Sequence, residues 1–234
     1  MNKRKLFFGF TLVSLFGLGI LSHWNFMNRN ETRVNILFNE NRSNFLNDSL
    51  VNKLLIQKIA NEDNQSNLKL DLRELEEYIE LLPEVHKAEV FSDIEGNVNV
   101  KIFESTALLR IQNEGFYLDP FGKKILFSNN YIPIVPIYSG YFKDDKIEDL
   151  VKLSKLIISD SYLKSEFVEI WNEKFGYSLR LRNHDFVVFW GNLKNIKEKR
   201  DKLKAFCAYA TENEFINKPK QIDLTIYDQI VSTH

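Results

Sequence analysis

The sequence contains one cysteine, Cys207, and four histidines among its 234 residues. A single thiol excludes an internal disulfide. One thiol and four scattered histidines do not supply the clustered ligands that a zinc site needs. We therefore predict no metal and no cofactor, and we expect packing alone to hold the chain together.

Sequence motifs of catalysis and nucleotide binding are also missing. The chain has no Gly-x-Ser-x-Gly, no His-Glu-x-x-His, no Walker loop and no Gly-x-Gly-x-x-Gly. Residues 161–164 read Ser-Tyr-Leu-Lys and fit Ser-x-x-Lys, but the Lys-Thr-Gly element of penicillin-recognising serine enzymes is absent. We predict no catalytic residue and no small-molecule substrate, and we interpret the protein as a non-enzyme.

The chain has no strong excess of either charge, with 31 basic and 32 acidic residues and a net charge of −1. Residues 1–30 hold four of the bases and no acid, so the remainder is mildly acidic. This balance provides no basic surface for nucleic acid. We predict a protein partner and no nucleic acid.

One long apolar run is present near the start of the sequence. Lys3, Arg4 and Lys5 precede residues 6–27, which carry no formal charge and would span about 33 Å as a helix. By the positive-inside rule, residues 1–5 stay in the cytoplasm and the rest of the chain is periplasmic. We predict a single transmembrane helix over 6–27 in the cell inner membrane. A cleaved signal peptide is the alternative, although bulky Ile20 stands where a small residue is expected.

A compact unit is predicted over residues 33–105, after a polar tether over 28–32. Val34, Ile36 and Phe38 alternate along the chain as in a half-buried strand. Asp71 to Glu74 has the spacing of a capping box, which begins a helix. We expect strands over residues 33–38, 87–91 and 98–103, and helices over 49–60 and 71–82, in the order β-α-α-β-β.

Residues 106–234 are predicted to form a mixed β-sheet domain with two helices, so the fold class is α+β. The helices are expected to begin at Asp144 and Asn192. The last strand lies near the end of the chain and is either an open sheet edge that accepts a partner strand or an ordinary paired strand. The expected strands cover residues 108–112, 116–118, 124–127, 134–139, 167–172, 177–182, 186–190 and 221–227.

Several segments, in this order behind the apolar run, resemble the cell division family FtsQ/DivIB, specifically its Bacteroidetes type. Residues 82–90 fit Pro-x-Val-x-x-Ala-x-Val, which in this family leads into the second strand of a POTRA domain. One departure is Ala107, where the family commonly has proline. Further similar segments are residues 117–124 (Leu-Asp-x-x-Gly), 135–140 (Val-Pro-x-x-x-Gly), 202–206 and 222–231.

The resemblance implies a POTRA domain over 33–105 and a scaffold of the divisome that binds FtsB- and FtsL-type partners in the periplasm. It further implies capture of a partner by strand addition at the last strand. The residues that it assigns to partner binding are Asp223, Leu224, Ile226, Tyr227 and Gln229. Two alternatives are a POTRA-containing factor of outer-membrane assembly or transport, and an anchored periplasmic cell-wall enzyme.

Overall fold

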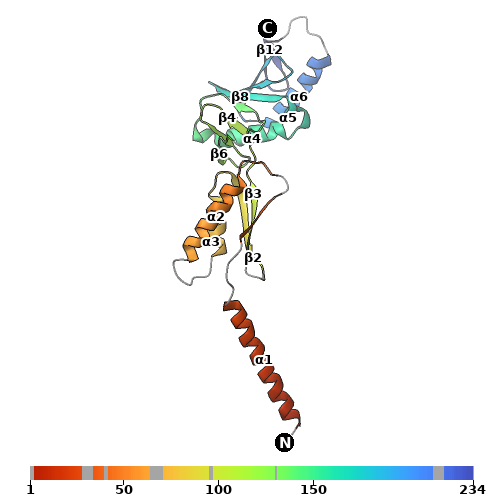
Figure 1. Cartoon of the computed structure of the whole chain (residues 1–234). Coiled ribbons are helices and arrows are strands. Elements are labelled where there is room, and N and C mark those ends of the chain that lie inside the picture. Colours follow the sequence, from red (N-terminus) through yellow and green to blue (C-terminus); the bar gives the residue numbers. More distant parts are fainter. Residues whose placement is uncertain are drawn as a thin grey trace.

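The computed structural model describes residues 3–27, 34–39, 42–63, 71–94, 97–129, 131–212 and 219–233. The predicted tether over 28–32 lies outside these residues. Figure 1 shows an elongated chain in which helix α1 (Lys3–Met27) is followed by a small unit and then by a larger one. The smaller unit is built on a three-stranded sheet and the larger on a nine-stranded sheet. This mixture of helices and sheets agrees with the predicted α+β class.

Helix α1 stands apart from both sheets (Figure 1). Its described side chains are mostly apolar and exposed, including Phe10, Val13 and Phe16, each more than 70 % exposed. When the helices are compared over their described residues alone, none combines the length and the apolarity that a membrane crossing requires. The transmembrane helix over 6–27 stays a prediction.

The smaller unit has the predicted order of elements. Strand β1 pairs in parallel with β3, and β2 pairs antiparallel with β3, which gives the sheet order β1-β3-β2. The two helices follow β1 in the chain and carry Val51, Leu55, Leu75 and Ile79 into a core shared with the sheet. The elements are β1 (Val34–Phe38), α2 (Asp48–Asp63), α3 (Leu72–Glu80), β2 (Val85–Ser92) and β3 (Val98–Glu104).

Helix α3 begins where the capping signal predicted. Asp71 is the N-cap residue, and its side chain accepts hydrogen bonds from the backbone N–H groups of Arg73 and Glu74. These bonds satisfy two N–H groups that have no partner within the helix. The helix ends at Glu80, before Pro83.

The larger unit is organised around the sheet β12-β11-β10-β9-β8-β7-β4-β5-β6. Most strands match the predicted positions, although several are shorter. Parallel pairs join β10 to β11, β4 to β7 and β7 to β8, and the remaining neighbours are antiparallel. The strands are β4 (Leu109–Ile111), β5 (Phe116–Leu118), β6 (Lys124–Leu126), β7 (Ile137–Tyr138), β8 (Phe167–Glu173), β9 (Gly176–Leu181), β10 (Val187–Gly191), β11 (Gln221–Asp223) and β12 (Val231–Thr233).

The prediction of two helices in this unit is wrong, because the described residues form three α-helices. They are α4 (Ile147–Ile158), α5 (Ser161–Glu166) and α6 (Ile196–Glu212), and a 3-10 turn over Asp144–Lys146 leads into α4. Helix α5 was missed because it has only six residues, too few to show helical periodicity. Asp160 caps it, accepting hydrogen bonds from the N–H groups of Tyr162 and Leu163.

The two units contact each other through the turn that joins β5 to β6. The Lys123 ammonium donates hydrogen bonds to the carbonyl oxygens of Glu80, Leu82 and Val85 at 2.9, 2.8 and 2.7 Å. Glu80 is the last residue of α3, so a cation lies where the helix dipole and its free carbonyls favour one. This turn therefore holds the C-terminal end of α3.

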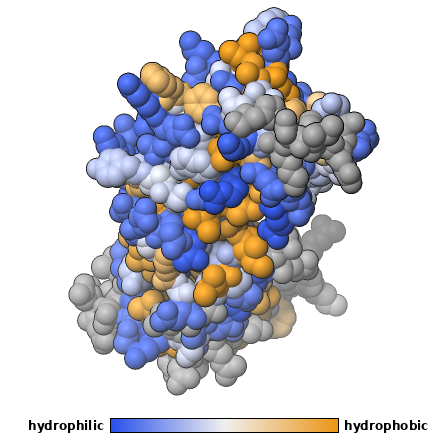
Figure 2. Space-filling model, turned by 90° about the horizontal axis from the view of Figure 1, so that it is seen from above, coloured by the Kyte–Doolittle hydropathy of each residue, from blue (hydrophilic) through white to orange (hydrophobic). Residues whose placement is uncertain are grey.

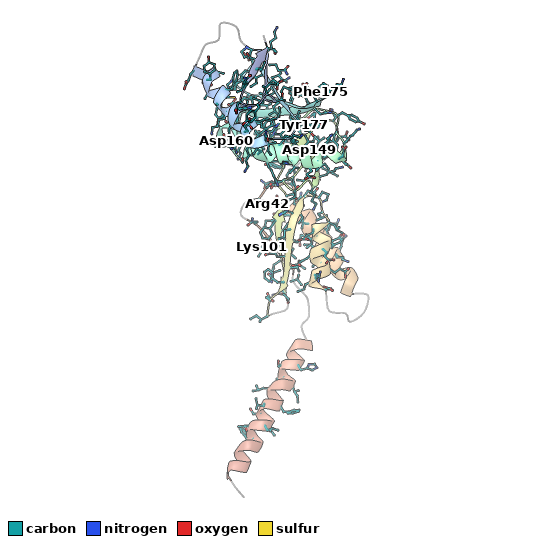
Figure 3. All side chains as sticks on the ribbon, turned by 180° about the vertical axis from the view of Figure 1, so that it is seen from behind. Arg42, Lys101, Asp149, Asp160, Phe175 and Tyr177 are labelled. Carbon is teal, nitrogen blue, oxygen red and sulfur yellow. The ribbon has the colours of Figure 1, made fainter. Side chains whose placement is uncertain are left out.

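A second contact between the units is apolar. Phe45, from the segment between β1 and α2, is 3 % exposed and packs with Tyr117 and Ile125 of the larger unit. Nearby, Arg42 lies at the junction of the two units (Figure 3) and bonds to Glu104 and Asp48. One side chain of the smaller unit, Phe45, thus completes a small core of the larger one.

Candidate partner-binding site

The C-terminal end of the chain forms a hairpin at one end of the nine-stranded sheet. Strand β11 pairs in parallel with β10 on one side and antiparallel with β12 on the other. The predicted strand over 221–227 is therefore wrong in extent, because β11 ends at Asp223 and the chain turns back through β12. In the described part of the molecule β12 is the end strand of the sheet, so its far side forms the open edge.

The five residues predicted to bind a partner lie in three different environments. Asp223 ends β11 and is half-buried, and its carboxylate accepts a hydrogen bond from the N–H of Thr225 at 2.7 Å. Leu224 is 1 % exposed and belongs to the core of the larger unit. Ile226, Tyr227 and Gln229 lie in the segment between β11 and β12 and are exposed, Tyr227 by 73 %.

Leu224 is thus turned toward the protein interior. The strand geometry explains this placement, because side chains alternate across a sheet and Ile222 and Leu224 share the buried face. The Leu224 N–H donates to the carbonyl of Phe189 at 3.1 Å, which continues the pairing with β10 beyond the last residue of β11. Its side chain contributes to folding and does not contact the solvent.

The exposed segment between β11 and β12 is held by helix α6. The Lys202 ammonium donates to the carbonyl oxygen of Ile226 at 2.7 Å and pairs with Glu198 on the same helix. Asp228 adopts a left-handed backbone conformation with φ of 50°, which reverses the chain toward β12. A cation on α6 therefore fixes the backbone directly before the exposed Tyr227.

Close packing also fixes the start of this segment. Gly191, at the end of β10, has φ of +71°, and a Cβ placed there would lie 2.4 Å from Cγ2 of Thr225. Only glycine allows both this backbone conformation and this approach. No local pattern predicts this contact, because Gly191 and Thr225 are far apart in the chain.

Helix α6 also carries a buried lysine. Lys199 is 5 % exposed, and its ammonium donates to the carbonyl oxygens of Trp190 and Asn192 at 3.0 and 2.8 Å. Removal from water lowers the pKa of this ammonium, while the negative charge of Asp223 opposes the shift. Lys199 therefore ties α6 to the end of β10, the strand that pairs with β11.

Figure 2 views the molecule from the end that carries the C-terminus, where hydrophobic residues form patches among hydrophilic ones. Three apolar or aromatic side chains of the hairpin are accessible to solvent. They are Ile226 (43 % exposed), Tyr227 (73 %) and Val231 (44 %). An open backbone edge next to exposed apolar side chains is a surface suited to another polypeptide.

Two buried tyrosines of the larger unit have structural partners. The Tyr177 hydroxyl donates to a carboxylate oxygen of Asp149 at 3.4 Å, and burial raises the pKa of this tyrosine (Figure 3). Burial also raises the pKa of Tyr138 to about 12, and its hydroxyl donates to Asn172 at 2.8 Å. Both tyrosines are therefore neutral hydrogen-bond donors near pH 7. Across the residues that the structure describes, no group of His, Cys, Asp and Glu side chains is arranged to hold a metal ion.

Comparison with known proteins gives one family match. The family model described as "FtsQ/DivIB, C-terminal related" matches residues 106–233, which is more than half of the chain. The match covers the nine-stranded sheet and the hairpin that ends it. No curated protein matches the sequence.

Proposed function

Because the chain belongs to the FtsQ/DivIB C-terminal related family, a family of non-enzymatic cell division scaffolds, we propose that it is a membrane-anchored scaffold of the bacterial divisome. In this proposal the larger unit binds FtsB- and FtsL-type proteins in the periplasm and links early and late division proteins. We further propose that the smaller unit is a POTRA domain, which its sheet order β1-β3-β2 and its two helices support.

The observation that carries the proposal is the open edge of β12 beside Ile226, Tyr227 and Val231. A partner segment in extended conformation would continue the sheet through main-chain hydrogen bonds, and its alternate side chains would meet these exposed groups. Tyrosine is a common anchor of protein interfaces, because it buries a large rigid ring and keeps a hydroxyl for a hydrogen bond. We therefore assign the open edge that would bind the partner to β12 and not to the predicted strand over residues 221–227. Tyr227, in the segment that precedes β12, would be the principal side chain of this surface.

The predicted anchor fits this role. Helix α1 presents apolar side chains such as Phe10, Val13 and Leu15 to its surroundings, and it precedes both units. We propose that residues 6–27 cross the inner membrane with residues 1–5 in the cytoplasm. A tether of this kind confines the scaffold and its partners to the same membrane and raises their effective concentration.

Co-purification of the full-length chain with FtsB- and FtsL-type proteins from the same bacterium tests the proposal. We expect the variant with Tyr227→Lys and Val231→Lys to recover at least about tenfold less partner than the unmodified chain, because both substitutions place a charge on the apolar surface. Tyr141→Lys is the matched control, since Tyr141 is 74 % exposed, almost the same as Tyr227, but lies far from the hairpin in sequence.

The control variant is expected to recover as much partner as the unmodified chain. Equal recovery by the double variant, or equal loss in the Tyr141 control, contradicts the assignment of the hairpin as the capture surface. Filaments without septa on depletion of the protein would support the division role, whereas loss of outer-membrane proteins would support the assembly factor instead.

A further inference from the structure

The smaller sheet has two edge strands, and one of them is closed by its own helix. The N–H of Ala88 donates to the Glu80 carboxylate at 3.0 Å, and the N–H of Val90 donates to the Glu76 carboxylate at 2.7 Å. Both acceptors lie on α3, and both donors lie on β2, which pairs with β3 on its other side. These two backbone donors of β2 are thus already bonded within the unit and are not available to an incoming strand.

The opposite edge strand, β1, has no such closure in the part of the chain that the structure describes. The Asn39 N–H donates to the carbonyl of Ile102 on β3, so the backbone groups of Asn39 and Leu37 face the sheet interior. Because successive residues of a strand direct their backbone groups to opposite sides, those of Ile36 and Phe38 point away from β3. No hydrogen bond among the described groups engages them.

A groove of about 530 Å³ runs along this edge of β1. It is lined by residues 34–38, by Asp48 and Asn52 of α2, and by Asn99 of β3. On the face toward the helices, Val34, Ile36 and Phe38 are half-buried and pack on the core, whereas Asn35 and Leu37 on the opposite face are exposed. A strand added here would therefore require apolar side chains on one face and would tolerate polar ones on the other.

We propose that the β1 edge is a second docking site, which binds an extended segment of another protein by strand addition. The occupant has alternating apolar residues. If α1 is the membrane anchor proposed above, the occupant also lies next to the membrane, because only six residues separate α1 from β1. This site is distinct from the β12 edge, since it belongs to the smaller unit and to a different sheet.

A second copy of this chain does not fit the edge symmetrically. If α1 is an anchor and β1 runs along the membrane normal, two copies in one membrane have β1 strands that run in the same direction. A two-fold axis parallel to such strands places identical residues at the same height. Parallel pairing instead requires the bonding residues of the two strands to be staggered, so identical outward groups cannot bond to each other. The geometry therefore favours a different polypeptide.

Residue-resolved hydrogen exchange of the full-length chain in lipid nanodiscs tests this proposal. The probe is an acetylated, amidated strand peptide, Lys-Thr-Val-Thr-Val-Thr-Val-Lys, added at millimolar concentration. We expect exchange of the Ile36 and Phe38 N–H groups to slow by about tenfold when the free peptide is about ten times its dissociation constant. The N–H groups of Leu37 and Asn39 bond within the sheet and should keep their rates. Unchanged rates at Ile36 and Phe38, or protection confined to β12, overturn the proposal.

Two sets of variants sharpen the test. Ile36→Pro removes an outward N–H that the sheet does not use, so the peptide should no longer protect Phe38 while Leu37 keeps its slow exchange. In the opposite direction, Glu76→Ala with Glu80→Ala should make the amides of Ala88 and Val90 exchange fast and then become protected by the peptide.

The matched control is Glu76→Gln with Glu80→Gln, which retains an acceptor oxygen at each position. It should leave β2 closed and leave peptide binding at β1 intact. If the amides of Ala88 and Val90 still exchange slowly in the alanine variant without peptide, the two glutamates are not the reason why the peptide binds at β1 and not at β2. Continued protection of Phe38 in the Ile36→Pro variant contradicts strand addition at β1.

Discussion

Replacement of Lys123 by methionine should uncouple the two units of this protein. Lys123 lies in the turn between β5 and β6 of the larger unit. Its ammonium donates to three backbone carbonyls of the smaller unit, at and after the end of α3. Methionine keeps much of the apolar stem but removes the charge and every donor. The carbonyls of Glu80, Leu82 and Val85 would then lose a common partner.

The expected cost follows from the environment of the ammonium. A hydrogen bond to a charged group contributes roughly 1.5–3 kcal/mol, but three bonds to one partly exposed ammonium are not additive. We therefore expect Lys123→Met to lower the free energy of unfolding by about 2 kcal/mol. For a chain of this length that corresponds to a decrease in Tm of about 4–8 °C.

Scanning calorimetry of the full-length protein measures this effect, with Lys124→Met as the matched control. Lys124 is the next residue and forms an exposed ion pair with Asp144 at 2.7 Å, a type of contact that contributes about 0–1 kcal/mol. We also expect the transitions of the two units to separate in the Lys123 variant only. Equal losses in the two variants, with no separation of transitions, refute the reasoning that Lys123 joins the units.

Substitutions at three further positions test local features. Gly176→Ala should lower the free energy of unfolding by at least about 2 kcal/mol in chemical denaturation, because φ is +144° and a Cβ would lie 2.1 Å from the backbone of Gly191. Asp71→Ala should cost about 1 kcal/mol and Asp71→Asn much less, since only alanine removes the acceptor that caps α3. Burial lowers the pKa of Lys199, so between its folded pKa and 10.5 the unfolded state binds more protons and stability should rise with pH. Chemical denaturation at several alkaline pH values measures this rise in stability. The rise should be absent in Lys199→Met, and a rise that persists in this variant would have to come from another group.

Local sequence patterns were sufficient to predict much of this fold. The Asp71 cap, the alternation of Val34, Ile36 and Phe38, and the order of elements in the smaller unit were all confirmed. These features depend on side chains only a few residues apart, so periodicity and capping chemistry reveal them. The family was also recognisable, because its short motifs keep their order along the chain.

The candidate site was less predictable, because long-range contacts define it. Residues 221–227 alternate as a strand would, yet the strand ends at Asp223 since the following segment bonds to α6 and packs against Gly191. Strand β12 has three exposed residues and no alternation of burial, so it gave no signal. Lys123 likewise reads as an ordinary turn residue until its distant carbonyl partners are known.

The position of Phe45 has a consequence for the order in which the chain folds during synthesis. Its partners Tyr117 and Ile125 follow it by about seventy to eighty residues, so they leave the ribosome several seconds later. Until then, the segment between β1 and α2 carries an apolar side chain without its final core, although the strands and helices around it are complete. The smaller unit therefore acquires its final form only when the start of the larger unit has emerged. A truncation that ends at β3 would expose Phe45 to water, and such a fragment should bind chaperones more strongly than its Phe45→Ser variant does.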